Sequence, residues 1–169
     1  MDIALVLDRL LPAAAYAGSL TANTQEAFDW LTWSDGRAKP TWQQVLDEWD
    51  IYSEEVLFSH LASYRYQKEV GGIVLGGLPV RTDDRSKTLL SGKYSKALQE
   101  NDPTKLNKVK LTSGFIDLTN QQLIDVFIAV ADHVQKCFDA EASVFTLIDN
   151  NTLTTEEAIE DAFDSAYAE

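Results

Sequence analysis

The clearest pattern in the chain is an apolar stripe between Thr119 and Asp149. Apolar residues recur there at alternating spacings of four and three, the period of one helix face: Leu123, Phe127, Val130, Val134, Cys137, Val144 and Ile148. Glu141 interrupts the stripe. Thr119 and Gln122 match a helix capping box, so we predict one long helix over residues 119–149. At about 1.5 Å per residue, its roughly 30 residues make a rod of about 45 Å.

A long helix with a regular apolar stripe is typical of a packing or assembly surface. We therefore take six of its residues as candidates for protein contact: Leu123, Phe127, Val130, Val134, Val144 and Ile148. The spacing suits self-association, and a homotrimer is the favoured oligomer. The same spacing also fits burial against the chain's own strands, which we favour for the central part of the helix.

Shorter periodic segments predict the other elements. The predicted helices span residues 2–11, 42–49, 54–69, 84–99 and 155–166. Short apolar runs on either side of turn residues predict two β-hairpins, which pair residues 73–75 with 78–80 and residues 109–112 with 114–117. Residues 28–33 alternate large with small or polar side chains, and they predict an extended segment.

Local capping signals mark where two of these helices begin. Thr41 and Gln44 match a capping box for the helix at residues 42–49. Thr154 and Glu157 match another for the last helix. The segment after residue 149 is acidic and has no basic residue, so we expect a weakly anchored tail element.

Together these elements predict an α+β protein. Two β-hairpins pack with three main helices, one of them the long helix of the C-terminal half, and a small Trp-rich unit precedes them. We expect a small N-terminal attachment unit at residues 1–51, an α+β domain at residues 52–150 and an acidic helix or tail at residues 151–169.

All four tryptophans of the chain fall within 20 residues: Trp30, Trp33, Trp42 and Trp49. A small unit needs large side chains to bury enough area, so an aromatic core is the simplest interpretation. Tryptophan is also favoured at the centres of protein interfaces, so the same residues are candidates for partner contact. A sugar-binding aromatic platform is a third alternative.

The net charge of the chain excludes some classes of binding partner. The chain has 14 Lys and Arg residues against 27 Asp and Glu residues, for a net charge of -13. Such a surface repels phosphate backbones and anionic lipid, so we expect neither nucleic-acid binding nor membrane insertion. Asp2 at the N-terminus and the interrupted apolar run that follows do not resemble a signal peptide, so we expect a protein that is made in the cytoplasm.

The sequence contains no strong signal for a cofactor or a metal. Gly71–Gly77 is glycine-rich but lacks the Lys-Ser/Thr pair of a phosphate loop. His133 and Cys137 share a helix face, but zinc needs three or four ligands and His60 is the only other histidine. Asp83-Asp84 and Asp149-Asn150-Asn151 are explained as helix-capping and turn residues, and they lack the spaced oxygen ligands of a calcium loop. We expect no cofactor and no catalytic residue.

The middle and C-terminal parts resemble the phage-encoded family DUF4376. The resemblance rests on segments that occur in the same order: Gly71-Gly72, Val80–Ser86, Leu118-Thr119, Ala131–Glu141 and Thr154–Ile159. It covers about two thirds of the chain. The Trp30–Trp49 segment is more weakly similar to segments of phage tail-fibre-associated proteins.

This resemblance implies a place in the virion tail. Members of the family are similar to domains found in tail fibre proteins or encoded beside them, and the family brings no established catalytic residues. We therefore expect a non-enzymatic tail component whose partner is a tail fibre or baseplate protein. One alternative is an assembly chaperone that binds fibre subunits transiently. Another is a factor that binds or degrades host-surface glycan, and degradation requires two carboxylates at a productive spacing.

Overall fold

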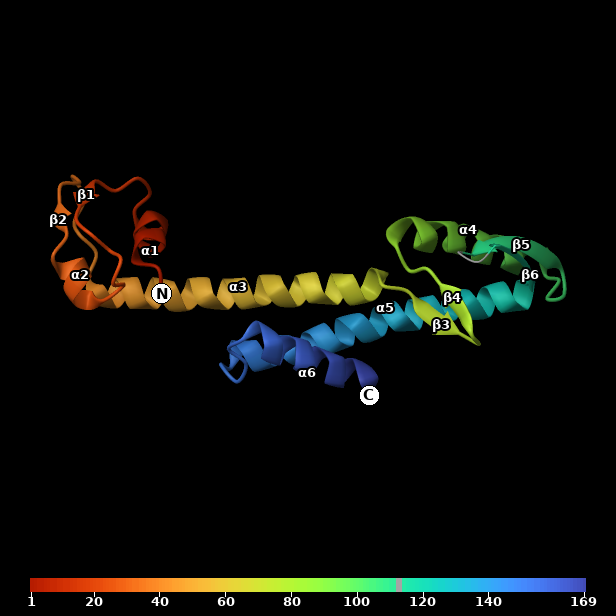
Figure 1. Ribbon diagram of the computed structural model, residues 1–169. Coiled ribbons are helices and arrows are strands. Elements are labelled where there is room, and N and C mark those ends of the chain that lie inside the picture. Colours follow the sequence, from red (N-terminus) through yellow and green to blue (C-terminus); the bar gives the residue numbers. More distant parts are fainter. Residues whose placement is uncertain (112–113) are drawn as a thin grey trace. The chain divides into compact units, whose positions relative to one another are not determined.

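The computed structural model describes residues 1–111 and 114–169 of the chain (Figure 1). Within these residues it has six helices and three two-stranded antiparallel sheets, which confirms the α+β class. The chain divides into two compact units, Met1–Leu57 and Phe58–Glu169. Helix α3 (Trp42–Val70) contributes residues 42–57 to the first unit and residues 58–70 to the second. None of the described helices combines the length and the apolar character needed to cross a membrane.

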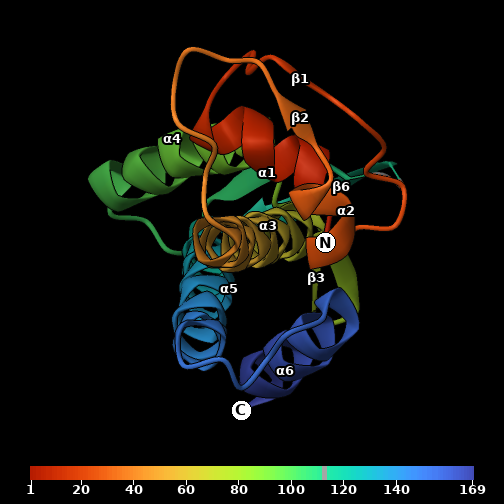
Figure 2. The ribbon, with the colours of Figure 1, turned by 90° about the vertical axis from the view of Figure 1, so that its left-hand side faces the viewer.

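The first unit is a small core built on the first turns of α3. Its other elements are α1 (Ile3–Leu10), β1 (Tyr16–Ala17), α2 (Gln25–Asp29) and β2 (Thr32–Trp33). The two short strands pair antiparallel, and α1 lies beside the start of α3 (Figure 2). The buried side chains that join these elements are Ile3, Val6, Leu7, Phe28, Leu31 and Val45.

The extended segment predicted at residues 28–33 is wrong in its first half. Phe28 and Asp29 belong to α2, because the Thr24 hydroxyl accepts the Ala27 N–H at 3.3 Å and so caps a helix start. Only Thr32 and Trp33 form a strand. The helix predicted at residues 2–11 is confirmed as α1.

The two helices predicted at residues 42–49 and 54–69 are one continuous helix, α3. Residues 42–70 contain neither glycine nor proline, so nothing in the backbone forces a break. Ser53, inside the expected gap, donates its hydroxyl to the Trp49 carbonyl oxygen at 2.8 Å, which is compatible with a helix interior. The predicted capping box is confirmed: Thr41 and Gln44 exchange side-chain and backbone hydrogen bonds at 2.8 and 3.2 Å.

The second unit arranges two hairpins and three helices around α5. Its elements after α3 are β3 (Ile73–Leu75), β4 (Leu78–Val80), α4 (Asp84–Glu100), β5 (Leu106–Leu111), β6 (Gly114–Thr119), α5 (Asn120–Asp149) and α6 (Glu156–Ala168). Helix α4 and the β5–β6 hairpin lie beside the first half of α5, and α6 lies beside its second half (Figure 1). Both predicted hairpins and the helix predicted at residues 84–99 are confirmed, although residue 112 lies outside the described residues.

The long helix is confirmed with its predicted start. Thr119 is the N-cap of α5, its hydroxyl accepts the Gln122 N–H at 3.1 Å, and the Gln122 side chain accepts the Thr119 N–H at 2.9 Å. The last helix departs from expectation. Its N-cap is Thr155 rather than Thr154. It is also firmly anchored, because Ile159 and Phe163 on one of its faces are fully buried.

Candidate functional site

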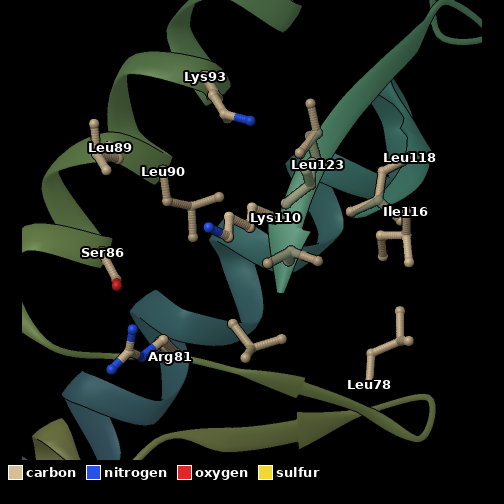
Figure 3. Close-up of a pocket in the computed structure, with 13 residues that line it drawn as sticks. Leu78, Arg81, Ser86, Leu89, Leu90, Lys93, Lys110, Ile116, Leu118 and Leu123 are labelled. Atoms are coloured by element: carbon tan, nitrogen blue, oxygen red, sulfur yellow. The ribbon is translucent and has the colours of Figure 1, made fainter. Parts of the chain in front are cut away.

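An apolar pocket of about 250 Å³ lies in the second unit where both hairpins meet α4 and α5 (Figure 3). Its walls come from five elements and include Leu78 of β4, Leu90 of α4, Val109 of β5, Ile116 of β6 and Leu123 of α5. A concave apolar site with a few polar groups at its edge is the usual form of a binding site.

Strand register brings the hairpin side chains to this pocket. In the β5–β6 hairpin Val109 is paired with Ile116, and both line the pocket because directly opposed residues project to the same face of a sheet. In the β3–β4 hairpin Leu75 is paired with Leu78 across a Gly76-Gly77 turn. Both turn glycines have positive φ angles of 56° and 81°, which explains why glycine occupies these positions.

Three cationic side chains line the same pocket: Arg81 after β4, Lys93 of α4 and Lys110 of β5. Figure 3 shows all three toward the α4 side, across from Leu78 and Ile116. Arg81 Nε lies 3.7 Å from Asp83 Oδ2.

The two lysines of the pocket contact uncharged groups. Lys93 Nζ donates to the Lys108 carbonyl oxygen at 3.4 Å, and Lys110 Nζ lies 5.8 Å from the centre of the Phe115 ring. Among the described residues, no carboxylate oxygen lies within 4.0 Å of either Nζ atom. The edge of the pocket is therefore positively charged in a chain that is strongly acidic as a whole.

A second group of polar side chains surrounds Glu69, which is only 6% exposed. Its carboxylate forms ion pairs with Arg65 of the same helix and Lys87 of α4. Its backbone carbonyl accepts the Thr82 hydroxyl at 2.5 Å and His133 Nε2 at 3.1 Å. These contacts join α3, the segment after β4, α4 and α5, so the cluster holds the second unit together.

One part of this cluster resembles a nucleophilic pair. Cys137 Sγ lies 4.0 Å from His133 Nδ1, and that nitrogen also contacts the Tyr167 hydroxyl at 2.7 Å. Cys137 is fully buried, and burial raises the pKa of its thiol to about 11. The thiol therefore stays protonated at neutral pH, which is the state of an inert structural cysteine.

The structure separates the four tryptophans into two groups. Trp33, Trp42 and Trp49 are partly buried against the core of the first unit. Trp33 stacks on Tyr16 at 5.9 Å and Trp42 contacts Phe28 at 5.6 Å between ring centres. Trp30, by contrast, is 80% exposed.

The six stripe residues lie mainly inside the second unit. Leu123, Val130, Val144 and Ile148 are between 1% and 4% exposed. Phe127 and Val134 are half-buried, and the Phe127 ring stacks on Tyr94 of α4 at 4.1 Å. The structure thus gives the stripe a role in the core, and its role in partner contact stays a prediction.

The two histidines have separate surroundings. His60 Nε2 lies 3.1 Å from Glu160 Oε1, and His60 Nδ1 lies 3.8 Å from Glu156 Oε2, whereas His133 belongs to the Glu69 cluster. Across the described part of the chain, no three His, Cys, Asp or Glu side chains converge as a metal site would require.

One sequence-predicted candidate, Leu123, lines the pocket, but its cations and the pocket itself were not predicted. The pocket's lining residues run from Leu78 to Val126. The sequence holds one local signal for the pocket. Lys93 follows Leu89 by four residues, so a cation and an apolar side chain, which is exposed in the structure, share one helix face. No short-range sequence pattern, however, predicts that this face of α4 meets the two hairpins.

Comparison with known proteins gives one finding. Residues 53–165 match the family described as "Domain of unknown function (DUF4376)". Neither the curated proteins nor the solved structures contain a match. Because the family match extends over more than half of the sequence, the chain belongs to the DUF4376 family.

Proposed function

We propose that the chain is a non-enzymatic component of a bacteriophage tail that binds a tail fibre or baseplate protein. The place in a tail rests on the resemblance of its segments to phage tail-associated proteins. The observation that carries the binding role is the exposure of Trp30, because its three neighbouring tryptophans pack against the first unit's core and Trp30 does not.

An exposed indole is a large apolar surface left in water. Burial of a large apolar side chain stabilises by roughly 1.5–3 kcal/mol, and Trp is enriched among the residues that dominate interface energies. Ile51 and Val56, in the part of α3 that belongs to the same unit, are also exposed, at 50% and 37%. The first unit is therefore the proposed attachment unit, and Trp30 is its proposed anchor.

An assembly chaperone would use the same contact for a shorter time, so its location in particles distinguishes it from a structural component. The experiment measures the amount of the chain, by immunoblot, in assembly intermediates and in mature particles purified from cells that produce it. A structural component remains in the mature particle at a constant ratio to the fibre protein. A chaperone is present in the intermediates alone, and absence from both contradicts the proposal.

Variants link this result to Trp30. Trp30→Ala is expected to lower incorporation at least tenfold, because loss of an interface anchor typically costs about 2 kcal/mol. Gln25→Ala, an exposed change in α2, the helix that Trp30 directly follows, is the matched control and is expected to incorporate normally. Turnover of host-surface glycan by the purified protein above background would contradict a non-enzymatic role.

Self-association is a separate part of the proposal. A homotrimer would match the threefold symmetry common in fibres, and the exposed Ile128 of α5 is available for contact between copies. Sedimentation equilibrium at high protein concentration tests it, and a strict monomer would remove the trimer.

A further inference from the structure

We propose that the pocket between the two hairpins, α4 and α5 binds an acidic, amphipathic segment of a partner protein. This goes beyond the proposed function, because the pocket lies in the second unit and the proposed anchor Trp30 lies in the first. Three features of the pocket carry the proposal: its size, the charge at its edge and the exposed apolar surface beside it.

The size of the pocket favours apolar side chains of a protein over a whole small molecule. Sites that enclose a small ligand usually measure about 300–1,000 Å³. This pocket measures about 250 Å³. It therefore suits one or two apolar side chains that project from a longer segment, with Leu90 and Ile116 among its walls.

The charge at the edge favours carboxylates on that segment. Most Lys and Arg side chains in this acidic chain have a carboxylate partner, whereas Lys93 and Lys110 have none within 4.0 Å among the described residues. With Arg81 of the segment after β4, the cations come from three different parts of the chain around the pocket (Figure 3). Such a spread matches several carboxylates along a peptide better than the single head group of one amphiphile.

Apolar surface continues outside the pocket. Leu89 of α4 lines the pocket and is 58% exposed, so its side chain carries the apolar surface beyond the pocket's edge. A segment seated on the pocket would cover such surface with neighbouring apolar residues. An amphipathic helix supplies anchors at spacings of three and four, with its acidic residues left for the lysines.

The experiment uses three synthetic helical peptides of 14 residues and the full chain. The test peptide has leucine at positions spaced three and four apart and glutamate on its other face. One control replaces each glutamate with lysine, and the other replaces each leucine with alanine. Titration calorimetry at 50 mM NaCl measures the dissociation constants. We expect saturable binding of the test peptide and no binding of either control peptide. At 500 mM NaCl the test peptide should bind more weakly, because salt screens the attraction between its carboxylates and the pocket's cations.

Charge reversal locates the binding site. The double variant Lys93→Glu/Lys110→Glu is expected to weaken test-peptide binding at least tenfold. The matched control Lys136→Glu changes a lysine of α5 that likewise has no carboxylate within 4.0 Å among the described residues. It lies ten residues beyond the pocket residue Val126 and should leave binding unchanged. Leu89→Ala, at a position that is 58% exposed, is expected to weaken binding about threefold.

Three outcomes would overturn the proposal. These are no saturable binding of the test peptide up to 1 mM, equal binding of the lysine peptide, and test-peptide binding that the double variant leaves unchanged. Binding of decanoate in place of the peptide would also overturn it and would assign the pocket to a small amphiphile. None of these results bears on whether the chain is present in tail particles, so the two proposals fail separately.

Discussion

His133 Nε2 donates a hydrogen bond of 3.1 Å to the backbone carbonyl oxygen of Glu69, which joins the middle of α5 to the end of α3. A carbonyl oxygen can only accept, so Nε2 carries the proton. The other ring nitrogen, Nδ1, then accepts the Tyr167 hydroxyl at 2.7 Å and reaches α6. One buried imidazole thus connects three helices of the second unit.

Replacement of this imidazole is expected to destabilise the second unit. His133→Ala leaves the Tyr167 hydroxyl without its partner and removes one bond to Glu69, at a cost of about 2–3 kcal/mol in the free energy of unfolding. Urea unfolding followed by circular dichroism measures it. His60→Ala is the matched control and should cost less than about 1 kcal/mol, because the Glu156 and Glu160 side chains that it contacts are 62% and 42% exposed. Equal losses for the two variants would contradict the connecting role of His133.

The buried thiol of Cys137 predicts a dependence of stability on alkaline pH. Its pKa is raised from 9.0 to about 11, chiefly by burial. The unfolded chain therefore loses this proton at lower pH than the folded chain. The Cys137 contribution to the free energy of unfolding is full below pH 9 and falls by up to about 2–3 kcal/mol as the pH rises to 11.

Comparison with Cys137→Ala isolates this contribution. The stability difference between wild type and variant should shrink between pH 9 and pH 11 in urea titrations with reductant present. A thiol reagent at pH 8 should react with the wild type only on unfolding. Parallel pH profiles, or rapid labelling of the folded chain, would show that the thiol is ionisable and accessible in the native state.

Two tryptophans of the first unit should differ sharply in their effect on stability. Trp30→Ala removes an exposed side chain and is expected to change the free energy of unfolding by less than about 0.5 kcal/mol. Trp42→Ala removes a ring that packs on Phe28 and should cost about 2 kcal/mol or more. Thermal or urea unfolding by circular dichroism compares them. A large loss for Trp30→Ala would mean that this indole supports the fold and not a partner contact.

The start of α5 is held by local hydrogen bonds that a single substitution removes. Thr119→Ala takes away the acceptor for the Gln122 N–H and is expected to cost about 1 kcal/mol. Thr119→Ser keeps the hydroxyl and should retain most of the stability. Denaturant midpoints of the two variants test this, and identical losses for serine and alanine would rule out the capping role of the hydroxyl.

The sequence predicts the elements whose signals are local. The α5 capping box needs only Thr119 and Gln122, three residues apart, and the β3–β4 turn needs only Gly76 and Gly77. The break expected in α3 was wrong because polar residues near Ser53 weaken the apolar period without stopping a helix. Around Ser53 the helix continues although the apolar pattern is interrupted, because the residues favour a helix and include neither glycine nor proline.

The sequence named Trp30 and Leu123 among its candidates, but it could not identify the pocket or show that Trp30 is exposed. The pocket depends on contacts between hairpins and helices separated by tens of residues, so Lys93 and Lys110 become neighbours only in the folded unit. The exposure of Trp30 is equally non-local. Trp30 directly follows the end of α2 and is exposed. Trp33, three residues later, packs on Tyr16 of β1. The stripe of α5 predicted a helix correctly but could not show that α4 and α6 cover it.

Electron cryomicroscopy of the purified tail would show directly whether this chain is a tail component. We expect density for the chain at a fixed position on the fibre or baseplate, with the Trp30 indole buried against a neighbouring subunit. A complete map in which other proteins explain all of the density, with none left for this chain, would contradict its role as a tail component.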